Sequence, residues 1–258
     1  MNEPLLKKKA KTIRRLCVQS SARTNSSHLG CSLSMADLMA YLFFEQMDQK
    51  ADTFILSKGH AAIGLYAALY EKGTISQKEY ESYHTNGSQL LAHPNHFVNG
   101  VEVSTGSLGH GPAIAAGLAW GKSIDKKPGT VYCLLGDGEC QEGTVWEALI
   151  FISRGLFKNL VLIIDANNYQ GFSDSSDSLF AQKKLLLMLK GTGLDVREIN
   201  GHSFKEIDQA LTDPLNKPRI LFAHTTKGKG VSYMENKFEW HYKSPNSEQL
   251  AQALEELQ

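Results

Sequence analysis

The chain has little cysteine and no long apolar run, and each absence excludes a class of protein. Its 258 residues include four cysteines, and none of them pairs as C-x-x-C, so neither a disulfide framework nor a zinc knuckle is expected; they are Cys17, Cys31, Cys133 and Cys140. The longest uncharged apolar-rich run, 61–70, is far shorter than the roughly 20 residues of a membrane span. Residues 1–15 contain no apolar signal-peptide core. We therefore expect a protein of the reducing cytoplasm with no membrane partner.

Net charge is also lacking. The 27 lysines and arginines balance the 27 aspartates and glutamates, so there is no general electrostatic attraction to nucleic acid. Hydrophobic residues make up 42% of the chain and charged residues 21%, a composition that excludes disorder as the main state. A chain of this length and composition can bury a substantial core.

Apolar strands alternate with helical segments along the chain. The expected strands are 53–56, 130–135, 160–164, 194–199 and 219–223, and the expected helices are 1–20, 35–44, 61–71, 76–83, 113–122, 141–154, 204–211 and 248–257. Continuously apolar strands are typical of a parallel sheet that is covered on both faces. The pattern predicts an α/β fold with a doubly wound, mostly parallel sheet, and a single domain over residues 1–258. Loops are expected at 20–34, 85–111 and 173–178, and the long 85–111 loop is of a length that is usually functional.

Polar residues follow two of these strands directly, Asp137 after one and Asn167 after the other. In doubly wound sheets, ligands bind beyond the carboxyl ends of the strands. Gly136 and Gly138 allow the backbone to approach a ligand, and the helix that begins near Gln141 favours an anion. Carboxylate and amide oxygens suit Mg²⁺, whose other ligands are often phosphate oxygens. The pattern predicts a diphosphate held through a metal ion.

Other interpretations compete at these positions. A dinucleotide-binding loop would need G-x-G-x-x-G, but Gln141 stands where the third glycine belongs. An isolated GDG can also be a turn in which Asp137 caps a helix. The chain has nine histidines, five of them between His60 and His110, which could be solvated loop residues or a site that handles phosphate or protons near neutral pH.

Taken together, the motifs carry a family resemblance. LLGDGECQEGTVWEA, followed after about thirty residues by IIDANN, resembles the thiamine-diphosphate fingerprint. SSHLGCSLSMADL, ILSKGHAAIGLYAALY, LAHP, VEVSTGSLGHGPAIAAGLAWG and TTKGKGVSYMEN…WH resemble successive motifs of the transketolase family, in the family's order. The resemblance extends over nearly the whole chain but matches only the N-terminal, diphosphate-binding (PP-type) domain of a full-length transketolase.

The resemblance implies which residues bind the cofactor. Asp137, Asn167 and the backbone carbonyl of Tyr169 match the metal ligands. The residues that match the thiamine-diphosphate site are His60, His241, Gly138 with its backbone N–H, Gly136 and Glu139 of the same turn, and Gly106, Ser107 and Leu108 beside the aminopyrimidine ring.

It also implies which residues act on the substrate. His28 and His93 match histidines near the reactive carbon and the hydroxyls of the donor sugar, and His241 also matches a residue of the substrate channel. Glu142 matches a carboxylate in a proton relay between two active sites at the dimer interface. These four are the expected catalytic residues.

The chain departs from the family pattern at several channel positions. Ser27-His28-Leu29-Gly30-Cys31 stands where many members have Gly-His-Pro-Gly-Ala, His110 replaces a glutamine, and Tyr242 replaces a glycine. These changes leave the donor and acceptor sugars undetermined.

In the family, the glutamate that activates the cofactor and the arginines that grip a sugar phosphate belong to the next domain, which has no counterpart here. The resemblance therefore implies the N-terminal subunit of a split, transketolase-like transferase, active only with a C-terminal partner chain that carries the glutamate, as an α₂β₂ heterotetramer. It would transfer a two-carbon ketol unit from a ketose or ketose phosphate to an aldehyde, using Mg²⁺ and thiamine diphosphate. The alternatives are a subunit of another thiamine-diphosphate enzyme, such as a 2-oxo-acid dehydrogenase α subunit or a biosynthetic synthase, and a non-catalytic cofactor-binding module.

Overall fold

A computed structural model describes residues 1–170 and 181–258 of the chain. At its centre lies a five-stranded sheet in the order β1-β2-β3-β5-β4, and every strand pair is parallel. The strands are β1 (Thr53–Leu56), β2 (Val131–Gly136), β3 (Leu160–Ala166), β4 (Asp195–Asn200) and β5 (Arg219–His224). In this register Gly136 lies beside Asp165 and Ala166 beside His224, so the carboxyl ends of β2, β3 and β5 meet at one edge.

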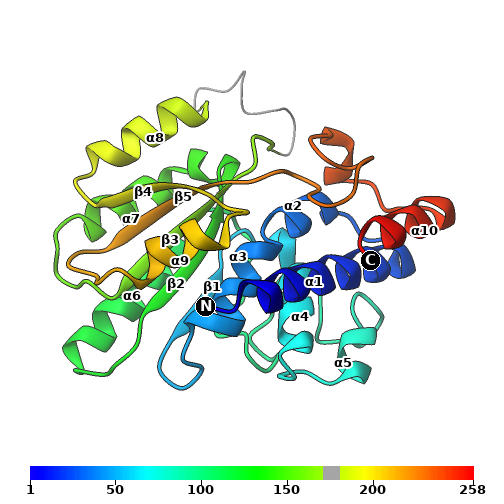
Figure 1. The fold of residues 1–258 in the computed structure, drawn as a ribbon. Coiled ribbons are helices and arrows are strands. Elements are labelled where there is room, and N and C mark those ends of the chain that lie inside the picture. The colour runs from blue at the N-terminus through cyan, green and yellow to red at the C-terminus, as the bar shows by residue number, and fades with distance from the viewer. Residues whose placement is uncertain (171–180) are drawn as a thin grey trace.

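Two layers of helices cover the sheet, and Figure 1 shows the larger layer extending to the right of it. This layer shares one hydrophobic core with Phe54, Leu134 and Ile163 of the strands. Its helices are α1 (Glu3–Thr24), α2 (Leu29–Ser34), α3 (Ala36–Tyr41), α4 (Ala62–Glu71), α5 (Gln77–Glu81), α9 (Phe204–Thr212) and α10 (Ser247–Glu256), with a π-helical turn at Leu42–Gln46.

The opposite face of the sheet carries α6 (Gly111–Ile124), α7 (Gly143–Ile152) and α8 (Gln182–Gly191). Their core includes Ile55, Leu135 and Ile164, the strand neighbours of the residues in the first core. Because successive side chains of a strand point to opposite faces, strands that are apolar at every position bury both faces. This is why β2 and β3 contain the uninterrupted apolar runs VYCLL and LVLII, whereas the edge strand β4 does not.

Short 3-10 turns lie at the ligand-binding edge of the sheet. Gly59–Ala61 follows β1, Gly138–Gln141 follows β2, and Phe238–His241 lies in the segment after β5. Residues 82–110 contain neither helix nor strand, which confirms the expectation of a long loop before α6.

The fold class predicted from the sequence is confirmed, and each expected strand lies within two residues of an observed one. Four details differ. Residues 29–34 form α2 where a loop was expected, and the helix expected over 35–44 is divided into α3 and the π-helical turn. The helix expected over 141–154 is α7 alone, because Gln141 ends a 3-10 turn, and α8 was not predicted. All six residues of α2 are buried, so the segment has no polar face to mark it as helical. The expected linker at 173–178 lies outside the described residues.

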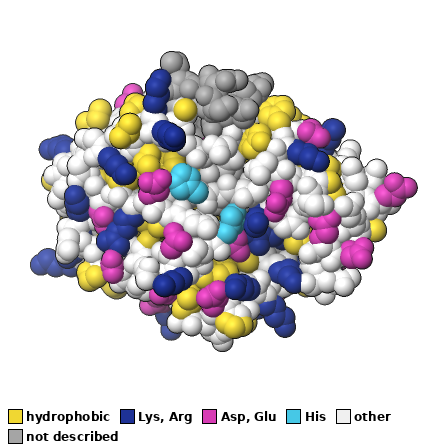
Figure 2. Space-filling model, turned by 45° about the horizontal axis from the view of Figure 1, so that its top comes forward, with side chains coloured by type: hydrophobic (Ala, Val, Ile, Leu, Met, Phe, Trp, Pro, Cys, Tyr) yellow, Lys and Arg dark blue, Asp and Glu magenta, His cyan; other side chains and the backbone are white. Residues whose placement is uncertain are grey.

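Over the described residues, no helix combines the length and apolar character needed to cross a membrane. All four cysteines are buried free thiols. Positive and negative side chains are interspersed over the face in Figure 2, which matches the absence of net charge.

Candidate active site

A cavity of about 440 Å³ opens at the carboxyl ends of β2 and β3. This volume lies in the range of about 300–1,000 Å³ that is usual for small-molecule sites. Its lining comes from segments that follow four of the five strands and from three loops: His28, Cys31, Lys58, His60, His93, Gly106, Leu108, Gly136, Asp137, Gly138, Glu139, Gln141, Glu142, Asn167, Tyr169, Gln170, Lys227, His241 and Tyr242. All site residues predicted from the sequence line it except Ser107, which is exposed next to the lining residues Gly106 and Leu108.

Asp137 occupies the turn after β2 and is only 4% exposed. Its carboxylate accepts hydrogen bonds from the backbone N–H groups of Gly138 and Asn168, each at 2.9 Å. Burial and the nearby charge of Asp165 raise the pKa of Asp137 to about 6. Burial and a nearby negative charge both disfavour the ionised form of Asp137, so a cation bound beside it would strongly stabilise that form.

Asn167 is oriented by its neighbour Asp165. The Asn167 Nδ2 donates to Asp165 Oδ2 at 3.0 Å, and Tyr169 N donates to Asn167 Oδ1 at 3.1 Å. Although burial favours the protonated acid, Lys58 holds the pKa of Asp165 below its usual range, so this carboxylate only accepts. The amide nitrogen of Asn167 must therefore face Asp165, which leaves the amide oxygen as the group available to a metal.

Three histidine rings stand together in the cavity wall. The ring centres of His28 and His60 are 5.3 Å apart, those of His28 and His241 5.0 Å, and those of His60 and His241 5.8 Å. Burial and neighbouring cations lower the pKa to about 4 for His28 and for His60 and to about 3 for His241. All three rings are therefore neutral near pH 7.

Lys227 reaches the cavity from the loop after β5 and is fully buried. Its ammonium lies 2.9 Å from His241 Nδ1 and 5.5 Å from the centre of the Tyr169 ring. Because an ammonium only donates, Nδ1 of His241 accepts, and the proton of the neutral ring is on Nε2. Burial lowers the pKa of Lys227, and no carboxylate in the described part of the chain forms a salt bridge with it.

Glu139 faces protein groups rather than the open cavity. Its carboxylate accepts from Ser57 Oγ, from Gly109 N at 2.9 Å and from Gly136 N at 3.1 Å. It thereby joins the segments after β1 and β2 to the loop before α6. The glutamate expected among the cofactor-binding residues thus holds three walls of the cavity together.

Gly138 permits a close approach of two walls. A Cβ atom at this position would lie 2.8 Å from Cβ of Gln170, a separation that real side chains do not reach. Glu142, the other predicted residue of this segment, precedes α7 with its side chain exposed at the rim.

The sequence interpretation did not assign roles to Lys58, Asp165 and Lys227. Lys58 and Asp165 form an ion pair with side chains 1% and 0% exposed. A signal for each was present: an acid at the end of the apolar run LVLIID, and lysines inside the SKGH and TTKGKG motifs. Their burial and pairing became evident only from the fold.

The cavity residues fit a metal diphosphate. A buried carboxylate (Asp137) and a buried cation (Lys227), which has no ion-pair partner among the residues that the structure describes, occupy one cavity, and each would be stabilised by the opposite charge of a ligand. No cluster of three or more His, Cys, Asp or Glu side chains able to hold a metal occurs within residues 1–170 and 181–258. A metal here would be held by mixed oxygen donors together with ligand oxygens, as Mg²⁺ usually is.

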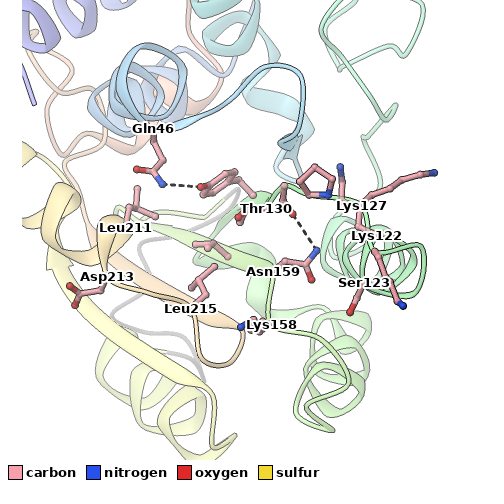
Figure 3. A pocket seen from close by; sticks show the side chains of 15 residues that line it. Gln46, Lys122, Ser123, Lys127, Thr130, Lys158, Asn159, Leu211, Asp213 and Leu215 are labelled. Carbon is pink, nitrogen blue, oxygen red and sulfur yellow. Dashed lines mark hydrogen bonds between the residues drawn. The ribbon is translucent and has the colours of Figure 1, made fainter.

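A larger cavity of about 650 Å³ lies at the opposite, amino-terminal ends of β2 and β3 (Figure 3). Lysines stand at its rim, but their ammonium groups do not converge: Lys122 Nζ donates to the carbonyl oxygen of Ala51, and Lys127 pairs with Asp125. The buried charged side chains Asp137, Glu139 and Lys227 line the cavity at the other edge.

The chain is similar to known proteins over nearly its whole length. Residues 6–257 match the family model described as transketolase, thiamine diphosphate binding domain. A subunit of the apulose-4-phosphate transketolase of Phocaeicola vulgatus is 36% identical over 255 residues, which cover 95% of this chain and 90% of the relative. Human transketolase is 36% identical over 98% of this chain. The crystal structure of Campylobacter jejuni transketolase superposes with a TM-score of 0.91 at 30% identity and covers the whole chain.

The coverage differs between these relatives. The chain spans 42% of human transketolase and 43% of the Campylobacter jejuni protein, but 90% of the Phocaeicola vulgatus subunit. In length it therefore corresponds to less than half of the human and Campylobacter jejuni proteins and to most of the Phocaeicola vulgatus subunit.

Proposed function

This chain belongs to the family of transketolase thiamine-diphosphate-binding domains, and from that premise we propose that it is the N-terminal subunit of a two-chain transketolase. The observation that carries the proposal is the cavity in which Asp137, Asn167 and Lys227 meet. We propose that residues 1–258 form one cofactor-binding domain. The reaction is the transfer of a two-carbon ketol unit from a ketose to an aldehyde, and the name of the Phocaeicola vulgatus relative favours phosphorylated sugars.

Asp137, the amide oxygen of Asn167 and the carbonyl of Tyr169 would hold Mg²⁺, and Asp165 keeps the Asn167 oxygen turned toward it. Lys227 and His60 would contact the diphosphate, and so would the N–H of Gly138 once a metal on Asp137 releases it from that carboxylate. Gly106 and Leu108 would lie beside the ring system, with Ser107 supporting them. When bound, thiamine diphosphate supplies the carbon nucleophile that carries the two-carbon unit.

The remaining residues would act on the sugar. His28, His93 and His241 are neutral near pH 7, because burial lowers the pKa of each ring. A neutral imidazole can donate to one sugar hydroxyl and accept a proton from another. Lys227 fixes His241 with Nε2–H free for such a contact. Glu142, exposed at the rim, would meet a second subunit.

The partner would be a chain that resembles the remaining transketolase domains and supplies the activating glutamate, in an α₂β₂ assembly. The four buried free thiols accord with the reducing cytoplasm that we propose as the location.

Calorimetry with Mg²⁺ and thiamine diphosphate tests the metal bridge. Asp137→Asn keeps the size of the side chain but removes its charge, so we expect metal-dependent cofactor affinity to fall at least about 100-fold, the scale of one buried charged contact. Asp125→Asn, at an exposed carboxylate remote from the cavity, is the matched control and should bind like the unmodified chain. Equal affinity of the two variants would contradict the assignment of Asp137.

His93→Ala separates substrate contacts from cofactor contacts. His93 lines the cavity, but none of its ring nitrogens is needed for the metal or diphosphate contacts proposed above. We expect an unchanged cofactor Kd and a loss of about 10²–10⁴-fold in kcat of the assembled enzyme, the range for removal of one proton-transfer group. A parallel loss of cofactor binding would show that His93 is not on the substrate side.

Reconstitution tests the two-chain assignment. The purified chain alone should not transfer ketol units, and the mixture with the partner chain should do so from a ketose phosphate. Carbon dioxide release from a 2-oxo acid by the same mixture would instead identify another thiamine-diphosphate enzyme. Cofactor binding without turnover of any ketose would favour a binding module.

A further inference from the structure

A second polar cluster lies outside the cavity and ends on the loop that carries Lys227. His202 stands between β4 and α9, and its Nδ1 lies 2.6 Å from Asp37 Oδ2 on α3. Arg14 on α1 pairs with the same carboxylate. On the other side of the ring, Thr226 N lies 2.8 Å from Nε2 of His202. The imidazole thus joins the helical layer to the backbone next to Lys227.

The partners determine how the ring is protonated. Although burial opposes it, Arg14 holds the pKa of Asp37 below its usual range, so this carboxylate accepts and Nδ1 of His202 must donate. The Thr226 backbone N–H donates, so Nε2 must accept. Both nitrogens are therefore used by a neutral ring, and the side chains of Arg14 and Asp37 are each only 9% exposed. The acceptor for Thr226 N is Nε2 of His202. The ring that carries it is rigid, and the bond between Nδ1 and Asp37 fixes its orientation.

Other hydrogen bonds also hold the loop from Thr225 to Gly230. Thr225 N donates to the Ala166 carbonyl oxygen at 3.1 Å, Lys229 N to the Thr226 carbonyl oxygen at 3.2 Å, and Gly230 N to Glu235 Oε1 at 2.9 Å. Thr225 Oγ1 donates to Asp165, Gly228 N donates to the Gly30 carbonyl oxygen at 2.9 Å, and Asn236 N donates to the Lys227 carbonyl oxygen at 2.9 Å. Thr226 is the residue directly before Lys227. Its bond to His202 connects the loop to Asp37 on α3 and Arg14 on α1. Loss of the His202 acceptor would leave the Thr226 N–H without its partner, which favours a displaced loop.

We propose that His202 is a positioning residue: through the Thr226 backbone it sets where the ammonium of Lys227 lies in the cavity, and Asp37 and Arg14 hold it in place. It touches neither cofactor nor substrate. The expected effect of His202 on cofactor binding rests on the proposed function, which assigns Lys227 to the diphosphate. The hydrogen bond between His202 and Thr226 does not depend on that function.

Hydrogen exchange of the cofactor-free full chain tests the contact. In His202→Ala, the segment 224–230 should exchange at least about 10-fold faster, whereas the β3 segment 160–166 should be unchanged. His202→Gln, which can return an acceptor to Thr226, should restore much of the protection. Unchanged exchange at 224–230, or equal acceleration throughout the chain, would overturn the proposal.

A double-mutant cycle tests whether His202 acts through Lys227. We expect His202→Ala to weaken binding of Mg²⁺ and thiamine diphosphate about 10-fold by calorimetry, and to have little further effect in a Lys227→Met background. The same loss in both backgrounds would mean that His202 supports the fold in general and would overturn the proposal. If the unmodified chain with its partner binds no thiamine diphosphate, the proposed function fails, and the exchange measurement alone decides on His202.

Discussion

At the scale of single residues, the site depends on charges and rings held away from water. His60 illustrates the effect: it lines the cavity, and burial with the nearby Lys58 lowers its pKa to about 4. An unfolded histidine has a pKa near 6.5, so the folded chain binds fewer protons than the unfolded chain between about pH 4 and 6.5. The stability is therefore fully present above pH 6.5 and declines as the pH falls through this window.

We expect the free energy of unfolding of the cofactor-free chain to fall between pH 7 and pH 5, with about 1–2 kcal/mol of the fall due to His60. Urea unfolding at the two pH values measures it. His60→Gln should reduce the fall by that amount, and His84→Gln, at an exposed loop histidine, should leave it unchanged. A fall of equal size in all three proteins would mean that His60 is not the source.

Most cavity residues could be predicted singly because motifs preserve residue type and spacing. Asp137 and Asn167 follow adjacent parallel strands, so the sequence order alone brings them near each other. Lys227 could not be predicted in this way, because its importance depends on burial beside His241, which is decided by a contact between distant segments.

At the scale of secondary-structure elements, a buried ion pair joins the ends of the strands. Lys58 lies two residues after β1, and Asp165 is the second-last residue of β3. The Asp165 carboxylate also accepts from Ser34 on α2, Thr225 after β5 and Asn167. One side chain therefore connects three strand ends and a helix at the rim of the cavity.

Asp165→Asn should destabilise the chain by about 3–5 kcal/mol, because it leaves the Lys58 ammonium buried without a counter-charge. Denaturant unfolding at pH 7 measures the loss. The double variant Lys58→Met with Asp165→Asn removes the unpaired charge and should recover part of the stability. If the double variant lost as much free energy of unfolding as the two single variants together, the broken ion pair would not be the cause of the instability of Asp165→Asn.

Strands were easier to predict than helices in this chain. β1, β2 and β3 are short apolar runs, and burial on both faces makes those runs continuous, whereas the edge strand β4 is largely polar. α2 is buried on all sides and so has no helical periodicity, while the sequence between β3 and β4 contains α8 without a clear start signal. Tertiary burial therefore decides the helices that local patterns leave open.

At the scale of the whole molecule, the proposed function makes the chain one side of a cofactor site. Its cavity combines oxygen donors with a buried cation, and the chain spans 42% of human transketolase. A ligand that binds only the folded chain stabilises it by mass action, by about 2.7 kcal/mol at 100 times Kd.

We expect Mg²⁺ with thiamine diphosphate at such a concentration to raise the Tm by roughly 5–10 °C, since about 1 kcal/mol corresponds to 2–4 °C at this chain length. Scanning calorimetry measures the shift. A chelator should abolish it, and thiamine without phosphate should give little of it. An equal shift with thiamine, or one that survives the chelator, would contradict binding through a metal-bridged diphosphate.

The amino-acid sequence by itself determined the parallel α/β fold, the edge of the sheet at which the proposed site lies and the residue types that follow β2 and β3. These depend on local patterns, namely apolar runs, turns and motif spacing, that persist whatever the chain packs against. Only the tertiary structure decided that Lys58 neutralises Asp165, that Lys227 stays without an ion-pair partner in the described part of the chain, and that His202 holds the Lys227 loop. The physical reason is that the state of a buried charge depends on the dielectric and the partners around it, and distant parts of the chain supply both.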